Sequence, residues 1–208
     1  MLIKENNLIF DLDGTLFDSA PEIICCIKKI FEINNIKVKN NINHSIIGPP
    51  LKDTLKSLVQ KKDINKIEGL MSDFIELYDS KYCYKTKLYK NVRETLEILR
   101  REKRLFLITN KRLVPTKIML ENKKIINFFE NFFCVDANDP KKKDKTTLIS
   151  STISDLNIDP MNTIYIGDTK GDFEASENNN IKFIYAGWGY GESIDSAFLC
   201  LNNISELI

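Results

Sequence analysis

Near its start the chain reads Phe10-Asp11-Leu12-Asp13-Gly14-Thr15-Leu16-Phe17-Asp18, directly after the apolar pair Leu8-Ile9. The apolar residues predict a buried strand, and Gly14 predicts that the strand ends in a turn. Side chains alternate between faces along a strand, but the turn lets Asp11 and Asp13 approach a common point. Two close carboxylates repel each other, so such a pair usually has a cation, a shared proton or a reacting phosphoryl group between them. We therefore expect a ligand site at the carboxyl end of this strand, where α/β domains bind their ligands.

Length and composition favour a globular protein without a nucleic-acid or membrane partner. The 208 residues suffice for one core domain and an insertion, and 43% of them are hydrophobic. The formal net charge of +1 gives no reason to expect nucleic acid. No apolar run approaches the ~20 residues of a membrane span, and the first residues lack the apolar stretch of a signal peptide. The expected location is cytoplasmic, and nothing in the sequence predicts an oligomeric state.

Cysteine and histidine give little evidence for a metal site. The five cysteines include the adjacent Cys25 and Cys26, and none has metal-ligand spacing to a histidine. We expect reduced thiols that mostly pack as small apolar groups. The single histidine, His44, lies in a polar stretch, and we assign it no catalytic role.

The order of the expected elements indicates an α/β fold with a helical insertion. Helical patterns come first, at about residues 21–33, 51–59, 63–81 and 91–101. Strands and helices then alternate, with strands at about residues 105–108, 131–135, 163–166 and 182–185 and helices at about 115–121, 146–156 and 172–177. Such alternation predicts a parallel sheet with helices on both faces. Asn91, with Glu94 three residues later, predicts a capping box.

Polar clusters stand where the predicted strands end. Asp11, Asp13 and Thr15 follow the first strand, Thr109-Asn110-Lys111 follows the second, and Gly167-Asp168-Thr169-Lys170-Gly171-Asp172 follows the strand at 163–166. Parallel strands would bring these clusters to one edge, where carboxylates suit Mg²⁺ and lysine suits phosphate. Taken singly, each of the other two clusters has a simpler structural explanation. Thr109-Asn110 could simply cap the next helix, and Asp172 could simply be an acidic residue that interacts with a helix dipole. The pair of Asp11 and Asp13 is harder to explain without a partner, because burying two carboxylates costs free energy.

Three of these segments resemble the motifs of haloacid dehalogenase (HAD) superfamily phosphatases. Asp11-Leu12-Asp13-Gly14-Thr15-Leu16 resembles the first motif, Thr109-Asn110-Lys111 the second, and the segment 167–172 the fourth. The insertion between the first two motifs is most similar to the phosphoglycolate phosphatase branch, whose cap loop and last loop resemble Gly48-Pro49-Pro50-Leu51 and Trp188-Gly189-Tyr190-Gly191. The resemblance implies a Rossmann-like core of residues 1–16 and 89–208 and a small all-helical cap domain of residues 17–88.

The resemblance also implies a Mg²⁺-dependent phosphomonoester hydrolase that acts on a small phosphorylated metabolite. Asp11 would attack phosphorus to form an aspartyl-phosphate, and Asp13 would act as general acid and then as general base. Mg²⁺ would be bound by Asp11, the backbone carbonyl of Asp13, and Asp168. The phosphate-binding residues would be Thr109, Asn110 and a lysine, and the supporting residues would be Gly14, Thr15 and Asp172.

The identity of that lysine is open, because the third motif departs from the family pattern. The family has a lysine often followed by Pro-x-Pro, but no proline follows any lysine in Asp139-Pro140-Lys141-Lys142-Lys143-Asp144-Lys145. Members without the prolines have a lysine that opens a helix about 22 residues before the glycine of the fourth motif, and counting back from Gly167 gives Lys145. The spacing of the proline-containing members gives Lys143 as the runner-up.

Two alternative functions share these motifs. A β-phosphoglucomutase-like phosphotransferase has overlapping motifs, and a non-catalytic binding protein could retain the fold. Asp13 argues against a haloalkanoic acid dehalogenase, because that reaction needs no acid two residues after the nucleophile.

The loop with Gly48, Pro49 and Lys52 is predicted to select the substrate. Between Phe17 and Lys90 the sequence has 13 lysines, no arginine and nine acidic residues, so this stretch has a net charge of +4. A positive lid would suit a substrate that is anionic beyond its phosphate, such as a phosphorylated carboxylate.

Overall fold

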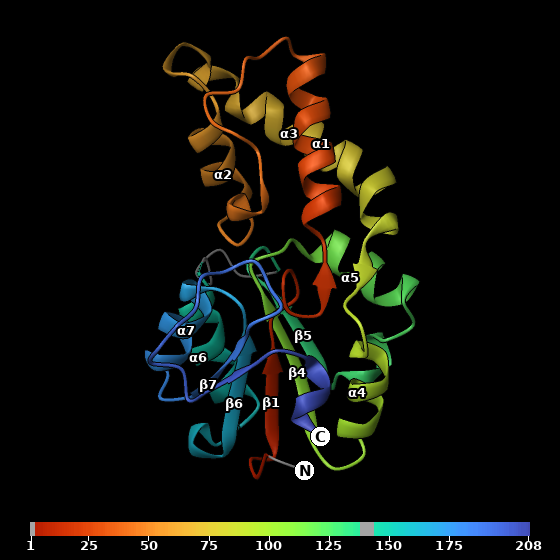
Figure 1. The fold of residues 1–208 in the computed structure, drawn as a ribbon, viewed down its shortest axis with the longest axis vertical. Coiled ribbons are helices and arrows are strands. Elements are labelled where there is room, and N and C mark those ends of the chain that lie inside the picture. The colour runs from red at the N-terminus through yellow and green to blue at the C-terminus, as the bar shows by residue number, and fades with distance from the viewer. Residues whose placement is uncertain (1–2, 138–143) are drawn as a thin grey trace.

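A six-stranded parallel sheet lies in the lower half of the molecule as Figure 1 shows it. The computed structural model describes residues 3–137 and 144–208. The strands of this sheet are β1 Asn7–Phe10, β4 Arg104–Thr109, β5 Asn131–Cys134, β6 Thr163–Gly167, β7 Lys182–Ala186 and β8 Leu199–Leu201. Their order across the sheet is β5-β4-β1-β6-β7-β8. The predicted parallel-sheet α/β core is confirmed.

The central strand β1 determines which side chains meet at the carboxyl edge of the sheet. It pairs with β4 on one side and β6 on the other, so that Phe10 lies between Leu107 and Ile166. The residues that follow these three therefore emerge next to one another. Leu8 and Ile9 are fully buried, as Phe10 is, because a parallel sheet is covered on both faces.

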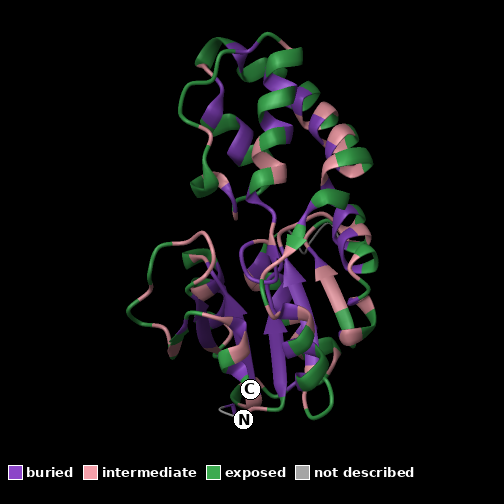
Figure 2. Cartoon of the chain, turned by 45° about the vertical axis from the view of Figure 1, so that its right-hand side comes forward, coloured by how far each residue is buried: buried purple, intermediate pink, exposed green. Residues whose placement is uncertain are grey.

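Helices cover both faces of the sheet, as predicted. Phe10 belongs to an apolar core shared with α4 (Val92–Leu99) and α5 (Leu113–Asn122). Ile9 points to the opposite face and belongs to a second core, shared with α6 (Lys145–Asp155) and α7 (Lys170–Glu177). Figure 2 shows the buried strands between helices whose outer surfaces are exposed.

A helical insert, residues 20–85, lies beyond the carboxyl edge of the sheet (Figure 1). Its helices are α1 Ala20–Ile33, α2 Leu51–Leu58 and α3 Ile67–Leu77, followed by a π-helical turn at Tyr78–Tyr82. Ile27, Leu55 and Phe74, one from each helix, are buried in the apolar core. Two short strands, β2 (Phe17–Asp18) and β3 (Lys87–Leu88), pair antiparallel where the chain enters and leaves the insert.

Short 3-10 turns complete the described secondary structure, at His44–Ile46, Lys61–Lys66, Cys83–Lys85, Ile126–Phe128, Pro160–Asn162 and Ile204–Leu207. Within the described residues, no helix combines the length and the apolarity that a membrane span needs.

Some elements differ from the expectation. The sequence did not predict β2, β3 or β8, because strands of two or three residues are too short to show an alternation of polar and apolar residues. The capping box predicted for Asn91 and Glu94 is wrong. Asn91 precedes α4 with a left-handed backbone (φ 67°), and its amide donates to Asn203 at 3.4 Å rather than capping the helix. A capping box forms instead at the start of α7, between Thr169 and Asp172.

Candidate active site

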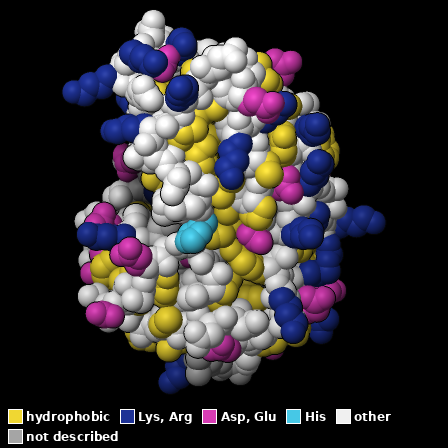
Figure 3. All heavy atoms as spheres, turned by 45° about the horizontal axis from the view of Figure 1, so that its top comes forward, with side chains coloured by type: hydrophobic (Ala, Val, Ile, Leu, Met, Phe, Trp, Pro, Cys, Tyr) yellow, Lys and Arg dark blue, Asp and Glu magenta, His cyan; other side chains and the backbone are white. Residues whose placement is uncertain are grey.

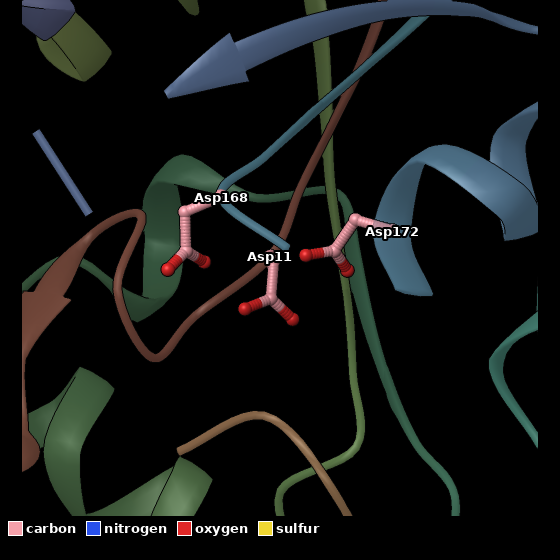
Figure 4. Close-up of side chains that lie close together, drawn as sticks. All are labelled: Asp11, Asp168 and Asp172. Atoms are coloured by element: carbon pink, nitrogen blue, oxygen red, sulfur yellow. The ribbon is translucent and has the colours of Figure 1, made fainter. Parts of the chain in front are cut away.

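Three buried carboxylates converge at the carboxyl edge of the sheet (Figure 4). Asp11 follows β1, Asp168 follows β6, and Asp172 lies in the first turn of α7. One oxygen from each lies within 4.8 Å of the others, and all three side chains are buried. The strand register explains this meeting, because β1 and β6 are neighbours and end at the same level.

Lys145 provides the positive charge inside this carboxylate cluster. It is the first residue of α6, where the Asp144 carboxylate accepts from the Thr147 amide at 2.8 Å and so caps the helix. Its Nζ lies 2.6 Å from Asp11 Oδ1 and also donates to Asp172 Oδ1. Burial lowers the pKa of Lys145, but attraction to Asp11 and Asp172 outweighs burial and raises the pKa well above its usual range. Lys145 therefore carries its charge in the site. Lys143, the alternative, lies outside the described residues, as do Lys141 and Lys142.

The cluster holds more negative charge than Lys145 can compensate. Burial, together with repulsion from Asp172, raises the pKa of Asp11 to about 7 although Lys145 opposes the shift. Burial, and then repulsion from Asp172 and Asp11, raises the pKa of Asp168 to about 8. The ionised forms of Asp11 and Asp168 are therefore disfavoured in this cluster, and a divalent cation bound beside them would stabilise these forms.

Asp172 is already bound by protein donors at both of its oxygens. Oδ1 accepts from Lys145, and Oδ2 accepts from the Thr169 backbone amide at 3.0 Å and the Thr169 hydroxyl at 2.6 Å. The contact with Lys145 is the one expected if Asp172 orients the lysine, and the contacts with Thr169 cap α7. Asp168 accepts from a hydroxyl and a backbone amide, and Asp11 accepts from Lys145 at Oδ1. Neither is held by a helix cap as Asp172 is, so these two carboxylates fit a metal ion better.

Asp168 is held by a tight shell of backbone and small side chains. Its Oδ1 accepts from the Thr15 hydroxyl at 3.3 Å, and its Oδ2 accepts from the Tyr190 amide at 2.8 Å. A Cβ on Gly14, which has a φ of +89°, would come within 2.1 Å of Asp168 Oδ2. A Cβ on Gly189 would come within 2.2 Å of Asp168 Cβ. The glycines of the first motif and the last loop therefore make room for this carboxylate.

We expect Gly14→Ala to destabilise the protein by roughly 1–3 kcal/mol, because the new methyl group meets Asp168 at a positive φ. The control is Gly69→Ala in α3, where a Cβ meets no atom within 4 Å. That change should be neutral or stabilise the helix by about 0.5–1 kcal/mol. Urea unfolding of both variants is the measurement, and equal effects would contradict the close packing at Gly14.

Asp13 faces the helical insert rather than the carboxylate cluster. Lys111 donates to both of its carboxylate oxygens, at 3.1 and 3.0 Å, and to the Tyr78 hydroxyl at 3.1 Å. Tyr78 belongs to the π-helical turn of the insert, and the neighbouring Asp79 forms a two-bond ion pair with Arg112, at 2.5 and 2.9 Å. Lys111 and Arg112 of the core loop thus bind Tyr78 and Asp79 of the insert, and Lys111 also holds the Asp13 carboxylate.

Sequence reasoning missed Lys111 and Tyr78 as site residues. Lys111 was recognised only as the last residue of the second motif, and its position directly after Thr109-Asn110 is the signal that could have found it. Tyr78 had no usable signal, because a tyrosine in a helical stretch is ordinarily a packing residue.

Thr109 and Asn110 lie at the site but make different contacts. Thr109 ends β4 and is 2% exposed, and its hydroxyl accepts from the Lys111 amide at 3.2 Å. Asn110 donates its side-chain amide to the Gly48 carbonyl at 3.3 Å, so it contacts the loop of the insert. Thr109 lies at the carboxyl end of β4, the neighbour of β1, whereas Asn110 is joined to the predicted substrate loop.

A cavity of about 260 Å³ lies between the strand ends and the insert. Its core side is lined by Asp11, Asp13, Thr109, Asn110, Lys145 and Asp172. Gly48, Pro49 and Lys52 of the predicted loop also line it. The Lys52 ammonium, however, pairs with Glu68 at 2.6 Å, and both side chains are largely exposed.

Known proteins are similar to this chain in sequence. The family model described as "Haloacid dehalogenase-like hydrolase" matches residues 8–186, which include Asp11, Asp13, Thr109, Lys145 and Asp168. A phosphoglycolate phosphatase of Colwellia psychrerythraea is 28% identical over 100% of this chain and 97% of its own length. An N-acetylmuramic acid 6-phosphate phosphatase of Pseudomonas putida is 24% identical over 88% of this chain and 83% of its own length.

The fold is also found among solved structures. A haloacid dehalogenase-like hydrolase of Streptococcus pneumoniae superposes with a TM-score of 0.88 at 24% identity, covering 98% of this chain and 96% of that one. The family model matches most of the length of the chain, and the motif residues Asp11, Thr109 and Asp168 lie at the ends of β1, β4 and β6. The chain belongs to the haloacid dehalogenase-like hydrolases.

Proposed function

We propose that this HAD-family phosphatase hydrolyses a small phosphorylated metabolite with Mg²⁺ and through an aspartyl-phosphate on Asp11. The observation that carries the proposal is the pairing of Asp11 with Lys145 beside Asp168, all three side chains being buried at the carboxyl edge of the sheet. A nucleophilic carboxylate, a cation for phosphoryl oxygens and a metal-binding carboxylate then stand in reach of one phosphate.

In the first step, Asp11 attacks phosphorus while the bond between phosphorus and the leaving oxygen breaks. Asp13 gives a proton to that oxygen, so the product leaves as an alcohol. In the second step, water attacks phosphorus, Asp13 takes the proton of the water, and the bond between phosphorus and Asp11 breaks. Lys145 and the Thr109 hydroxyl bind the phosphoryl oxygens in both steps, and Lys111 holds Asp13 in position.

Asp11, Asp168 and the backbone carbonyl of Asp13 are proposed to hold Mg²⁺. The donor set fits, because Mg²⁺ takes oxygen ligands and usually one or two carboxylates. When bound, the ion would lower the repulsion between the Asp11 carboxylate and the phosphate dianion. The excess of carboxylates over cations in the cluster supports this assignment.

The proposal includes a division into a core of residues 1–16 and 89–208 and a cap of residues 17–88. The β2–β3 ribbon lies at the proposed boundary. Closure of the cap would keep bulk water from the aspartyl-phosphate. The five cysteines are all free thiols, as expected for a reducing compartment, so a cytoplasmic location is also proposed.

Release of phosphate from p-nitrophenyl phosphate and from a set of small phosphorylated metabolites tests the proposal. We expect turnover with Mg²⁺, and a fall to background after chelation that Mg²⁺ reverses. Binding without any turnover would favour the non-catalytic alternative. Isomerisation of a sugar phosphate without net release of phosphate would favour a phosphotransferase like β-phosphoglucomutase.

A further inference from the structure

The cavity over the active site has two chemically different ends. The end at the sheet carries the carboxylates, Lys145 and Thr109, which suit a phosphate and a metal ion. The end at the insert is lined mostly by apolar side chains, which include Ile23, Ile27, Ile46, Pro50, Met71 and Phe74. The first two come from α1, the next two from the loop before α2, and the last two from α3. A phosphomonoester bound with its phosphate at the sheet would therefore place its leaving group among apolar side chains.

The described lining of the cavity offers no uncommitted positive charge to a second anionic group. Each of its lysines and arginines pairs with a carboxylate of the protein. The pairs are Lys52–Glu68 at 2.6 Å, Lys111–Asp13 at 3.0 Å, Arg112–Asp79 at 2.5 Å and Lys145–Asp11 at 2.6 Å. A carboxylate on the substrate would have to displace one of these partners or remain unpaired among apolar groups, and an unpaired buried charge is strongly unfavourable.

Of the 13 lysines between Phe17 and Lys90, only Lys52 is among the residues that line the cavity, and its ammonium pairs with Glu68. All 13 lysines between Phe17 and Lys90 are exposed. Figure 3 shows lysine and arginine side chains spread over the outer surface and interspersed with acidic ones. Charges in that position are screened by water and salt. The positive lid predicted from composition is a solvated surface, and it gives no reason to expect a phosphorylated carboxylate.

We propose that the physiological leaving group is small, uncharged and predominantly apolar, and that the insert side of the cavity binds it by burying it against α1 and α3. This inference rests on the proposed phosphatase function and names its substrate class. Burial of an apolar group against Ile23 and Met71 is favourable, whereas burial of a carboxylate there leaves it without a partner. Binding energy from the non-reacting part of the substrate then positions the phosphate for attack.

Two phosphomonoesters of nearly the same shape test the inference. Isobutyl phosphate differs from phosphoglycolate in that an isopropyl group replaces the carboxylate. We expect kcat/KM with Mg²⁺ to be at least about tenfold higher for isobutyl phosphate, because only its leaving group is free of charge. An equal or higher kcat/KM for phosphoglycolate would overturn the inference.

Substitution of Met71 should change this preference in a predictable direction. Met71 is half-buried in α3, and Met71→Arg would bring an unpaired cation to the apolar end. The ratio of the two kcat/KM values should then shift toward phosphoglycolate by about tenfold or more. Met71→Leu should keep the wild-type ratio, and so should Lys56→Ala, which removes an exposed lysine of α2. An unchanged ratio in Met71→Arg, with the fold verified by circular dichroism, would contradict the assigned binding site.

Affinity measured without turnover separates this inference from the proposed reaction. Calorimetric titration of the Asp11→Asn variant with each ester should give tighter binding of isobutyl phosphate. If the wild-type protein hydrolyses neither these esters nor p-nitrophenyl phosphate and the metabolite set, the proposed function fails, while the affinities still decide the inference. If both esters are hydrolysed but phosphoglycolate binds more tightly, the inference fails and the proposed function stands.

Discussion

Asp11→Asn is expected to lower turnover by at least about 10³-fold, because an amide cannot serve as the nucleophile and the groups of such a site act as a unit. Asp11 is buried directly after β1, and its Oδ1 lies 2.6 Å from the Lys145 ammonium. Asp172 shares that lysine but lies in the first turn of α7 and caps it with Thr169. The variant should remain folded, since asparagine has the same shape and its carbonyl oxygen can still accept from Lys145.

The measurement is kcat for p-nitrophenyl phosphate with freshly purified protein, together with circular dichroism. Asp195→Asn, at an exposed aspartate, is the matched control and should retain wild-type turnover. More than a few per cent of wild-type activity in Asp11→Asn, with purity verified, would contradict the role of Asp11 as nucleophile.

Lys145→Ala should produce the second largest loss, of about 10²–10³-fold in kcat. A lysine in a site that excludes water acts on developing charge far more strongly than a solvated lysine does. The change also leaves Asp11 and Asp172 without their shared cation, so we expect a lower free energy of unfolding as well. Lys145→Arg separates the two effects, because it keeps the charge near the carboxylates but alters the geometry at the phosphate.

Lys170→Ala is the matched control for this prediction. Lys170 begins α7, and its side chain is 82% exposed, so its removal should change kcat little. Measured kcat values for Lys145→Ala, Lys143→Ala and Lys170→Ala therefore decide which lysine binds phosphate. A larger loss for Lys143→Ala than for Lys145→Ala would show that the spacing argument identified the wrong residue.

The sheet and the position of the carboxylates could be predicted from the sequence because they depend on local patterns. Leu8-Ile9-Phe10 is continuously apolar because both faces of β1 are covered. Gly14 marks the turn after this strand, at a position where a Cβ would collide with the Asp168 carboxylate. Alternating strands and helices imply a parallel sheet, and a parallel sheet aligns its carboxyl ends. These arguments require no knowledge of side-chain contacts between distant segments.

The contacts between the core loop and the insert could not be predicted in this way. Lys111 reaches Tyr78 only because the insert folds back over the strand ends, and the Asn110 amide is directed to Gly48 for the same reason. The composition of the cavity lining could not be predicted for a related reason. Net charge counts every lysine of the insert, whereas a substrate meets only the side chains that point inward.

The stereochemical course at phosphorus tests the central claim most directly. An in-line displacement inverts the configuration of the transferred phosphoryl group, and an aspartyl-phosphate requires two such displacements. Hydrolysis in oxygen-17 water of a phosphorothioate O-monoester whose phosphorus is chiral through sulfur, oxygen-16 and oxygen-18 should therefore give inorganic thiophosphate with net retention of configuration. Net inversion would mean that water attacks the substrate directly, and it would contradict a covalent intermediate on Asp11.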